Sequence, residues 1–148
     1  MNLIIDSNTI QTETPQDITI YLRNCYPQKF KRVGLKSITL QNARELMKFC
    51  RSTDTNNVVF NLLYVHCDIV NKDYNFINDE KCNILSIIPF GQKQLSDKCF
   101  TYVYDNCSYK TIKSGDITSL RIYITKGDNQ VININAAFAV TYELEFIE

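Results

Sequence analysis

The sequence predicts an all-β protein, a sandwich or barrel of about eight strands with one short helix. Three observations support this fold class. Short runs of alternating apolar and polar residues recur along the chain, turn-forming residues separate them, and only one segment has its apolar residues at helical spacing. Because the strands are not interleaved with helices, a βαβ arrangement is disfavoured.

The overall composition fits one globular domain. The chain has 148 residues, of which 45% are hydrophobic and 22% charged, so it can bury a core of its own. Its 16 basic residues balance 16 acidic ones. A chain without net charge has no long-range field that favours nucleic acid or an anionic membrane, and we expect neither as a partner. We interpret the one basic cluster, residues 29–32, as a solvated turn.

The chain shows none of the patterns of export or membrane insertion. No stretch approaches the roughly 18 apolar residues that a membrane span needs, and the apolar start, residues 1–6, has no basic leader. We therefore expect a protein without a membrane span, made and used inside a cell or in a particle assembled there.

The first elements are a polar arm and a strand. Residues 7–16 are mostly polar and show no period. Residues 1–16 are therefore predicted to form an N-terminal arm, and residues 17–148 the domain. Residues 18–22 alternate with period two, which predicts the first strand of that domain.

A strand with a change of face and a helix follow. In residues 33–40 the apolar positions move from one face to the other, which predicts a bulge near residues 34–37 or a strand buried on both sides. The helix is predicted over residues 42–51, with Asn42 as its cap and Glu45 three residues further on as in a capping box.

The central region is rich in β-branched and aromatic residues. Residues 58–70 form a long run that is apolar on both faces in its first half, typical of a central strand or of a surface covered by a partner. Residues 71–81 are polar and turn-like. Three further strands are predicted, the first of them ended by Pro89, at residues 84–88, 100–104 and 108–112.

The C-terminal part has the clearest pattern. Alternation over residues 120–124, a turn with its glycine at residues 126–130, and Ile132 and Ile134 beyond it predict a hairpin. In residues 138–146 every second residue is apolar and lies on one face. This predicts a final strand in a sheet with one buried face.

The single histidine, His66, is the first candidate for chemistry, because general-base catalysis most often uses histidine. Asp68 lies two residues on, on the same face of the predicted strand. Cys67 points to the opposite face and cannot act as a nucleophile for its neighbour. We therefore interpret His66 and Asp68 as a polar pair at the edge of a sheet.

Other kinds of site find no support in the sequence. The cysteines lack metal-ligand or disulfide spacing, and we expect reduced core residues: Cys25, Cys50, Cys67, Cys82, Cys99 and Cys107. Four acidic residues lack the calcium-loop pattern: Asp68, Asp73, Asp79 and Glu80. The four glycines are too scattered for a phosphate loop, and the aromatic residues are expected to fill the core. We therefore predict no catalytic, cofactor-binding or metal-binding residue, no cofactor and no enzymatic activity.

Several strand-like segments resemble single jelly-roll capsid proteins. Ile18–Leu22 and Val33–Leu40 are similar to the two opening strands of such proteins. Leu63–Val70 (LYVHCDIV) and Ile84–Pro89 (ILSIIP) resemble a "Y-V-Y-C-D-I-V … L-L-R-I-V-P" stretch in penton-type proteins of polinton-like viruses, adintoviruses and virophages. The ending is similar in two segments, Ile117–Ile124 and Gly127–Asn129.

The resemblance implies a single jelly roll whose strands stand upright in a capsid wall. It implies a structural viral protein, the penton subunit, that assembles with itself as a homopentameric ring at the vertices of an icosahedral shell. The implied partner is a major capsid protein of the double jelly-roll type, and the implied location is the virion capsid, assembled inside the host cell. The family has no catalytic residues to carry over.

Other interpretations stay open. A minor or cement capsid protein would show the same pattern, and so would a lectin-like or receptor-binding β-sandwich module. A small enzyme on a cupin-like barrel is disfavoured, because cupins usually bind their metal through several histidines and this chain has one.

Overall fold

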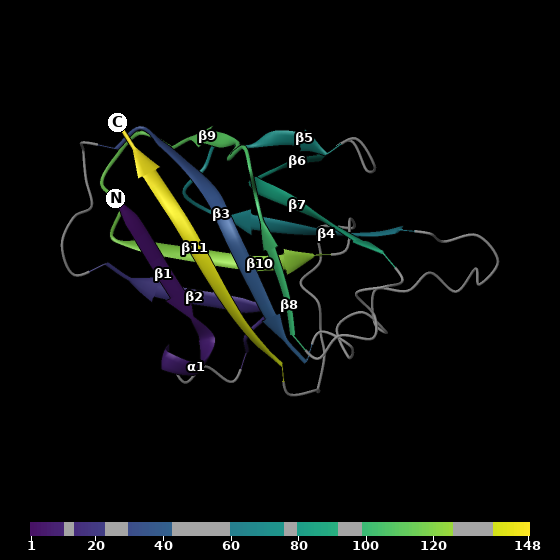
Figure 1. Cartoon of the computed structure of the whole chain (residues 1–148). Helices are drawn as coiled ribbons and strands as arrows, with labels where there is room; N and C mark the ends of the chain where they lie inside the picture. Colours follow the sequence, from purple (N-terminus) through teal and green to yellow (C-terminus); the bar gives the residue numbers. More distant parts are fainter. Residues whose placement is uncertain (11–13, 23–29, 43–59, 76–79, 92–98, 126–137) are drawn as a thin grey trace.

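Two antiparallel sheets pack face to face in the computed structural model of the chain (Figure 1). The structure describes residues 1–10, 14–22, 30–42, 60–75, 80–91, 99–125 and 138–148. Within these residues, no helix is long and apolar enough to cross a membrane.

The first sheet has five strands. Four lie in the order β1-β11-β3-β8, and the short β9 also pairs with β3. Their bounds are β1 (Asn2–Asp6), β3 (Arg32–Gln41), β8 (Cys99–Val103), β9 (Tyr109–Thr111) and β11 (Ala139–Ile147).

The second sheet has four strands in the order β2-β10-β4-β7. Their bounds are β2 (Asp17–Tyr21), β4 (Phe60–Cys67), β7 (Ile84–Gly91) and β10 (Ser119–Thr125). A separate short pair is formed by β5 (Asp73–Asn75) and β6 (Glu80–Cys82), and one helical turn, α1 (Ser7–Ile10), follows β1.

The strand order identifies the architecture. Leaving out the short β5, β6 and β9, the remaining strands are paired first-eighth-third-sixth in one sheet and second-seventh-fourth-fifth in the other. Two four-stranded sheets connected in this way form a jelly roll. The predicted fold class, an all-β single jelly-roll sandwich, is confirmed.

The core fills the space between the two sheets. The last strand shows how the sequence pattern builds it, because the apolar residues that alternate along it are all buried: Phe138, Val140, Tyr142, Leu144 and Phe146. Opposite them lie residues of the second sheet such as Ile122 and Leu63, which are also fully buried. Burying a large apolar side chain contributes roughly 1.5–3 kcal/mol, so this core dominates the stability of the fold.

The change of face in β3 is a bulge, as predicted. Ser37 pairs with Glu143 and Leu35 with Leu144, so Lys36 has no counterpart on β11. The extra residue reverses the alternation and places the apolar residues before and after it on the same inner face. All of them are buried: Val33, Leu35, Ile38 and Leu40.

The predicted arm begins with a strand of the sheet. Residues 2–6 form β1 and pair with β11. Met1 exchanges two backbone hydrogen bonds with Phe146, of 2.8 and 2.9 Å, and Ile5 is buried. We did not predict this strand, because so short a segment carries too few alternations to show a period. The division at residue 17 stays a prediction, since an arm would be a property of the assembled particle.

Two predictions in the middle of the chain were wrong. Pro89 does not end its strand, because β7 continues to Gly91. β7 is an edge strand, and a proline is tolerated there because no neighbour needs its missing N–H. The segment 71–81, predicted as turn-like, contains β5 and most of β6.

Two other predictions fall outside the described residues. They are the helix, apart from its first residue Asn42, and the turn and return strand over residues 126–134. Asn42 itself follows the last residue of β3 and has a φ of 58°, a conformation that asparagine tolerates better than most residues.

Candidate assembly surfaces

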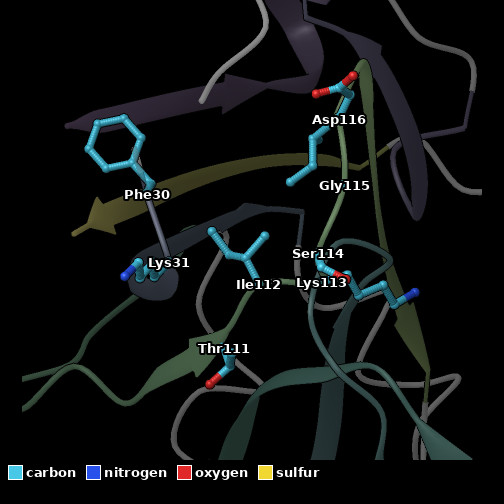
Figure 2. A pocket seen from close by; sticks show the side chains of 9 residues that line it. Phe30, Lys31, Thr111, Ile112, Lys113, Ser114, Gly115 and Asp116 are labelled. Carbon is cyan, nitrogen blue, oxygen red and sulfur yellow. The ribbon is translucent and has the colours of Figure 1, made fainter. Parts of the chain in front are cut away.

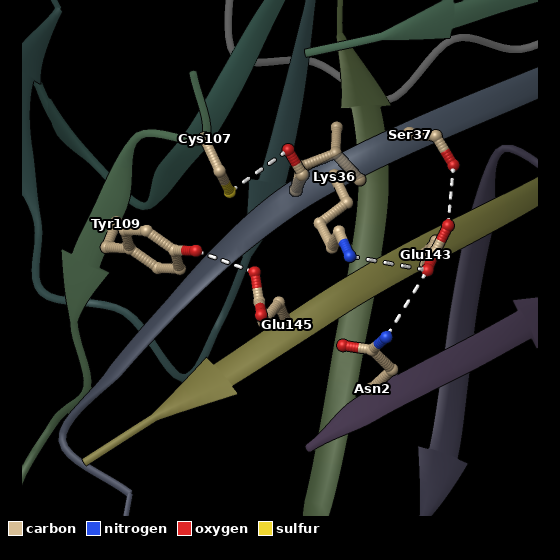
Figure 3. A network of polar contacts seen from close by, with 8 residues as sticks. Asn2, Lys36, Ser37, Cys107, Tyr109, Glu143 and Glu145 are labelled. Carbon is tan, nitrogen blue, oxygen red and sulfur yellow. Dashed lines mark hydrogen bonds and ion pairs between the residues drawn. The ribbon is translucent and has the colours of Figure 1, made fainter. Parts of the chain in front are cut away.

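A polar network covers the outer face of the first sheet (Figure 3). Glu143 accepts hydrogen bonds from Ser37 at 3.2 Å and from Asn2 at 3.5 Å, and the ammonium of Lys36 lies 3.9 Å from its carboxylate. The side chains of Lys36 and Glu143 are 39% and 34% exposed. Such a pair contributes at most about 1 kcal/mol, so the network mainly keeps this face hydrophilic.

A second contact on this face crosses β3 at Gly34. In the register, Gly34 lies between Tyr109 of β9 and Glu145 of β11. The Tyr109 hydroxyl donates to Glu145 over a distance of 2.6 Å, and the Cys107 thiol donates to the carbonyl of Leu35 (Figure 3). A Cβ at position 34 would clash with the Cys107 sulfur. The bond to Glu145 raises the pKa of Tyr109 to about 12.

On the outer face of the second sheet, three side chains pack against one another in a row. Arg121 on β10 donates two hydrogen bonds to Asp17 on β2, of 2.8 and 2.7 Å. Its guanidinium lies 4.5 Å from the centre of the Tyr123 ring. On the neighbouring strand β4, His66 pairs with Tyr123. The two rings are stacked, with centroids 4.6 Å apart and an interplanar angle of 5°.

His66 lies in the middle of this sheet and not at its edge, so that part of our interpretation was wrong. β4 has β10 on one side and β7 on the other, and His66 is fully buried. Its Nε2 shares a hydrogen bond of 2.8 Å with the Thr125 hydroxyl. Asp68 lies just past the end of β4, where it accepts from the backbone N–H of Arg121 at 2.9 Å. The two predicted partners therefore bind different groups.

Burial keeps His66 uncharged. Loss of hydration and, secondarily, the nearby charge of Arg121 lower its pKa to about 4. Its Nδ1 is buried and has no hydrogen-bond partner among the described residues. A neutral, enclosed imidazole stacked on a tyrosine has the geometry of a packing group.

The cysteines divide into buried and exposed ones. Cys67 and Cys82 are buried and are not joined in a disulfide, as predicted, and burial raises the pKa of Cys67 to about 12. Cys99 is exposed and Cys107 half-buried, so the expectation of core residues was wrong for Cys99. Two of the six lie outside the described residues, Cys25 and Cys50.

The acidic residues considered as calcium ligands in the sequence analysis lie only partly within the described residues. Asp79 is not described, and of Asp73 and Glu80 the backbone alone is. Among the side chains that are described, no three His, Cys, Asp or Glu residues come together as metal ligands would.

Large hydrophobic side chains are exposed on strands toward two opposite sides of the sandwich. Figure 1 shows where these strands run. One set lies on β1, α1 and β2, which we call the β1–β2 side: Met1, Ile4, Ile10 and Tyr21. The other set lies on β4, β7 and β8, which we call the β7–β8 side: Leu62, Ile87 and Val103. Tyr21, Ile4 and Val103 are exposed by 82%, 66% and 63%. Single exposed apolar side chains are ordinary on a protein surface, whereas several on one side of a molecule can belong to a surface that a partner covers.

The sequence analysis did not single out these residues, although a signal was present. Tyr21 occupies the polar face of an alternating strand, opposite the buried Ile18. Ile4 and Ile87 each stand beside a second isoleucine, Ile5 and Ile88, that is buried. Two large apolar neighbours in a strand point to opposite faces, so one of each pair had to lie on the outside.

An open hollow of about 520 Å³ lies at one end of the sandwich (Figure 2). Phe30 and Ile112 form part of its apolar lining and pack against the core, and Lys31, Lys113 and Asp116 add charges. The Phe30 ring lies 6.0 Å from that of Phe146, near the last residues of β11. The hollow is thus at an end of the strands, separate from the two apolar sides.

No protein-family model matches the chain, and no curated protein is similar to it in sequence. The comparison with solved structures does find a similar protein, the mavirus penton protein, known from a crystal structure. The match covers 99% of this chain and 99% of that one, with a TM-score of 0.61 and 9% sequence identity. The two proteins share a fold. The resemblance drawn from short segments of the sequence is thereby confirmed at the level of fold.

Proposed function

We propose that this chain is a viral capsid protein, the penton subunit, which assembles as a homopentameric ring at the vertices of an icosahedral shell. The observation that carries the proposal is the fold shared with the mavirus penton protein, from end to end in both chains. The jelly-roll strand order and the two apolar sides support it. We assign the chain no catalytic role, no bound cofactor and no metal.

The proposal extends to the surroundings of the ring. Its neighbours are copies of a major capsid protein of the double jelly-roll type, and its location is the virion capsid, assembled inside the host cell. Because the chain has no net charge, copies can approach without long-range repulsion. Contact with nucleic acid is not part of this role.

Light scattering of the purified chain tests the proposal. A homopentamer has five times the 17.2 kDa of one chain, or 86 kDa, and we expect this mass over a wide range of concentration and salt. A strictly monomeric species over the same range would overturn the proposal. If that monomer also bound a glycan on an array, a lectin-like or receptor-binding module would take its place.

A further inference from the structure

The geometry points to a head-to-tail contact between copies of this chain, in which the β1–β2 side of one copy packs against the β7–β8 side of the next. This inference rests on the proposed function, because it names the surfaces that would close the ring. Its occupant is a second copy of the chain, and its starting point is the distribution of exposed apolar side chains along the two opposite sides.

The two sides differ in how their strand edges are protected. On the β7–β8 side, Pro89 within the edge strand β7 lacks an N–H, and the Tyr104 hydroxyl occupies the carbonyl of Ile87 at 3.0 Å. Proline and covered carbonyls prevent another strand from pairing at an edge. The backbone beside Ile87 is therefore closed to strand pairing, and the Ile87 side chain stays available for contact. Val103 lies on the other edge strand of this side, β8.

Among the described residues, the β1–β2 side carries no such protection. β1 and β2 contain neither proline nor lysine, and their registers run without a bulge. Leu22 donates its N–H to Thr118 in the β10 direction. Backbone groups alternate in direction along a strand, so those of Tyr21 point away from β10. An open edge with Ile4 and Tyr21 on it needs a cover in the assembled state.

The four central residues also correspond face to face. Ile4 and Val103 lie on the outer face of the first sheet, since they pair with Glu143 and Ser37 of the polar network. Tyr21 lies on the outer face of the second sheet, opposite Ser119, and Ile87 lies on that face as well, opposite Tyr64. Copies standing side by side in one orientation would bring Ile4 next to Val103, since both lie in the row of paired residues that runs through Glu143 and Ser37. Tyr21 and Ile87 would lie on the same face of the contact at different heights, because their rows cross β10 at Ser119 and at Thr125.

The placement on opposite sides determines the kind of assembly. A contact between two different surfaces repeats from copy to copy and closes into a ring when the rotation between copies completes a full turn, whereas a surface that pairs with itself gives a two-fold dimer. A stable contact of ordinary size covers about 800 Å² per partner. That is roughly a tenth of the 9087 Å² surface of one copy, an area that one side of the sandwich can supply.

Two one-sided variants test the inference by native mass spectrometry and light scattering. The first, Ile4→Glu with Tyr21→Glu, disables the β1–β2 side. The second, Ile87→Glu with Val103→Glu, disables the β7–β8 side. We expect each variant alone to be a monomer of 17.2 kDa, because every contact needs one surface of each kind. Mixed in equal amounts, the two should form a heterodimer of twice that mass and nothing larger, since only one working contact remains.

The controls separate this inference from the proposed function. Ser114→Glu adds one negative charge at an exposed end position and should keep the wild-type mass. Circular dichroism and Tm verify folding, and the milder Tyr21→Ser and Ile87→Ser, which should weaken the ring at low concentration, replace any variant that does not fold.

Each remaining outcome contradicts the inference in a different way. A wild-type ring that both one-sided variants still form would overturn the assigned surfaces and leave the proposed function standing. If one variant alone kept the wild-type mass, the contact would join like surfaces. A monomeric wild type would overturn both.

Discussion

The Tyr109 hydroxyl of β9 reaches across β3 to Glu145 of β11, a hydrogen bond of 2.6 Å that passes over Gly34. It ties the short outer strand β9 to a strand that is not its neighbour. The contact exists because Gly34 has no side chain to fill the space between Cys107 and Tyr109. One glycine in the bulged region of β3 thus shapes this part of the outer face.

Gly34→Ala should destabilise the protein by about 1–3 kcal/mol, the usual cost of forcing extra volume into a packed site. The new Cβ would clash with the Cys107 sulfur and come within 3.1 Å of the Ser108 carbonyl. Urea unfolding measures the loss. The double variant Gly34→Ala with Cys107→Ala removes the nearest atom and should recover part of it. A neutral Gly34→Ala would contradict the close approach.

Tyr109 should be among the last tyrosines to ionise. Its hydrogen bond to Glu145 raises its pKa to about 12, so in an absorbance titration Tyr109→Phe should remove a group that titrates near that pH. A raised pKa means that the folded state holds the proton more tightly. The stability that Tyr109 contributes is therefore present below about pH 10 and lost as the pH rises through 12. Glu145→Gln should return the Tyr109 titration toward pH 10, and an unchanged titration would exclude the hydrogen bond as its cause.

Acid should destabilise the protein through His66. The folded-state pKa is lowered from 6.5 to about 4, so the unfolded chain binds a proton first as the pH falls. Above about pH 6.5 the free energy of unfolding does not depend on His66. Between pH 6.5 and 4 the His66 contribution decreases by at most about 1.4 kcal/mol per pH unit, and below pH 4 it no longer changes. Because the chain has one histidine, NMR can follow its titration without assignment. A midpoint near 6.5 in the folded protein would contradict the buried site.

Arg121→Lys should have a small effect on stability, and Arg121→Gln should in addition change the titration of His66. The side chain of Arg121 is 43% exposed, so losing its two-point bond to Asp17 should cost only about 0.5–1 kcal/mol, and less at high salt. Arg121→Gln removes the charge that helps to lower the pKa of His66, and the NMR midpoint should then move upward, while Arg121→Lys keeps most of the shift. Equal midpoints in the wild type and Arg121→Gln would show that the charge has no influence.

Long alternating segments allowed most of the fold to be predicted. β11 is recognisable because its five apolar residues keep one period over nine positions, and the bulge at Lys36 because the period changes phase within one strand. Both signals are local. Strand order is not local, because the pairing of β1 with β11 joins residues from the two ends of the chain. The resemblance to capsid proteins predicted the jelly roll but not the strand β1.

The surfaces were harder to predict than the core. His66 was expected at an edge as one half of a polar pair with Asp68, whereas the stacking on Tyr123 and the bond to Thr125 come from β10. Pro89 was taken as the end of a strand, because whether β7 lies at an edge depends on the whole sheet. Tyr21 and Val103 became visible as exposed groups only once the inner face of each strand was known.

Electron cryo-microscopy of the purified chain tests the proposed function most directly, because the symmetry of the assembly can be seen without labels or variants. We predict closed rings with five-fold symmetry in which the β1–β2 side of each jelly roll faces the β7–β8 side of its neighbour. Single particles of one copy, or two-fold dimers joined through like sides, would contradict this account.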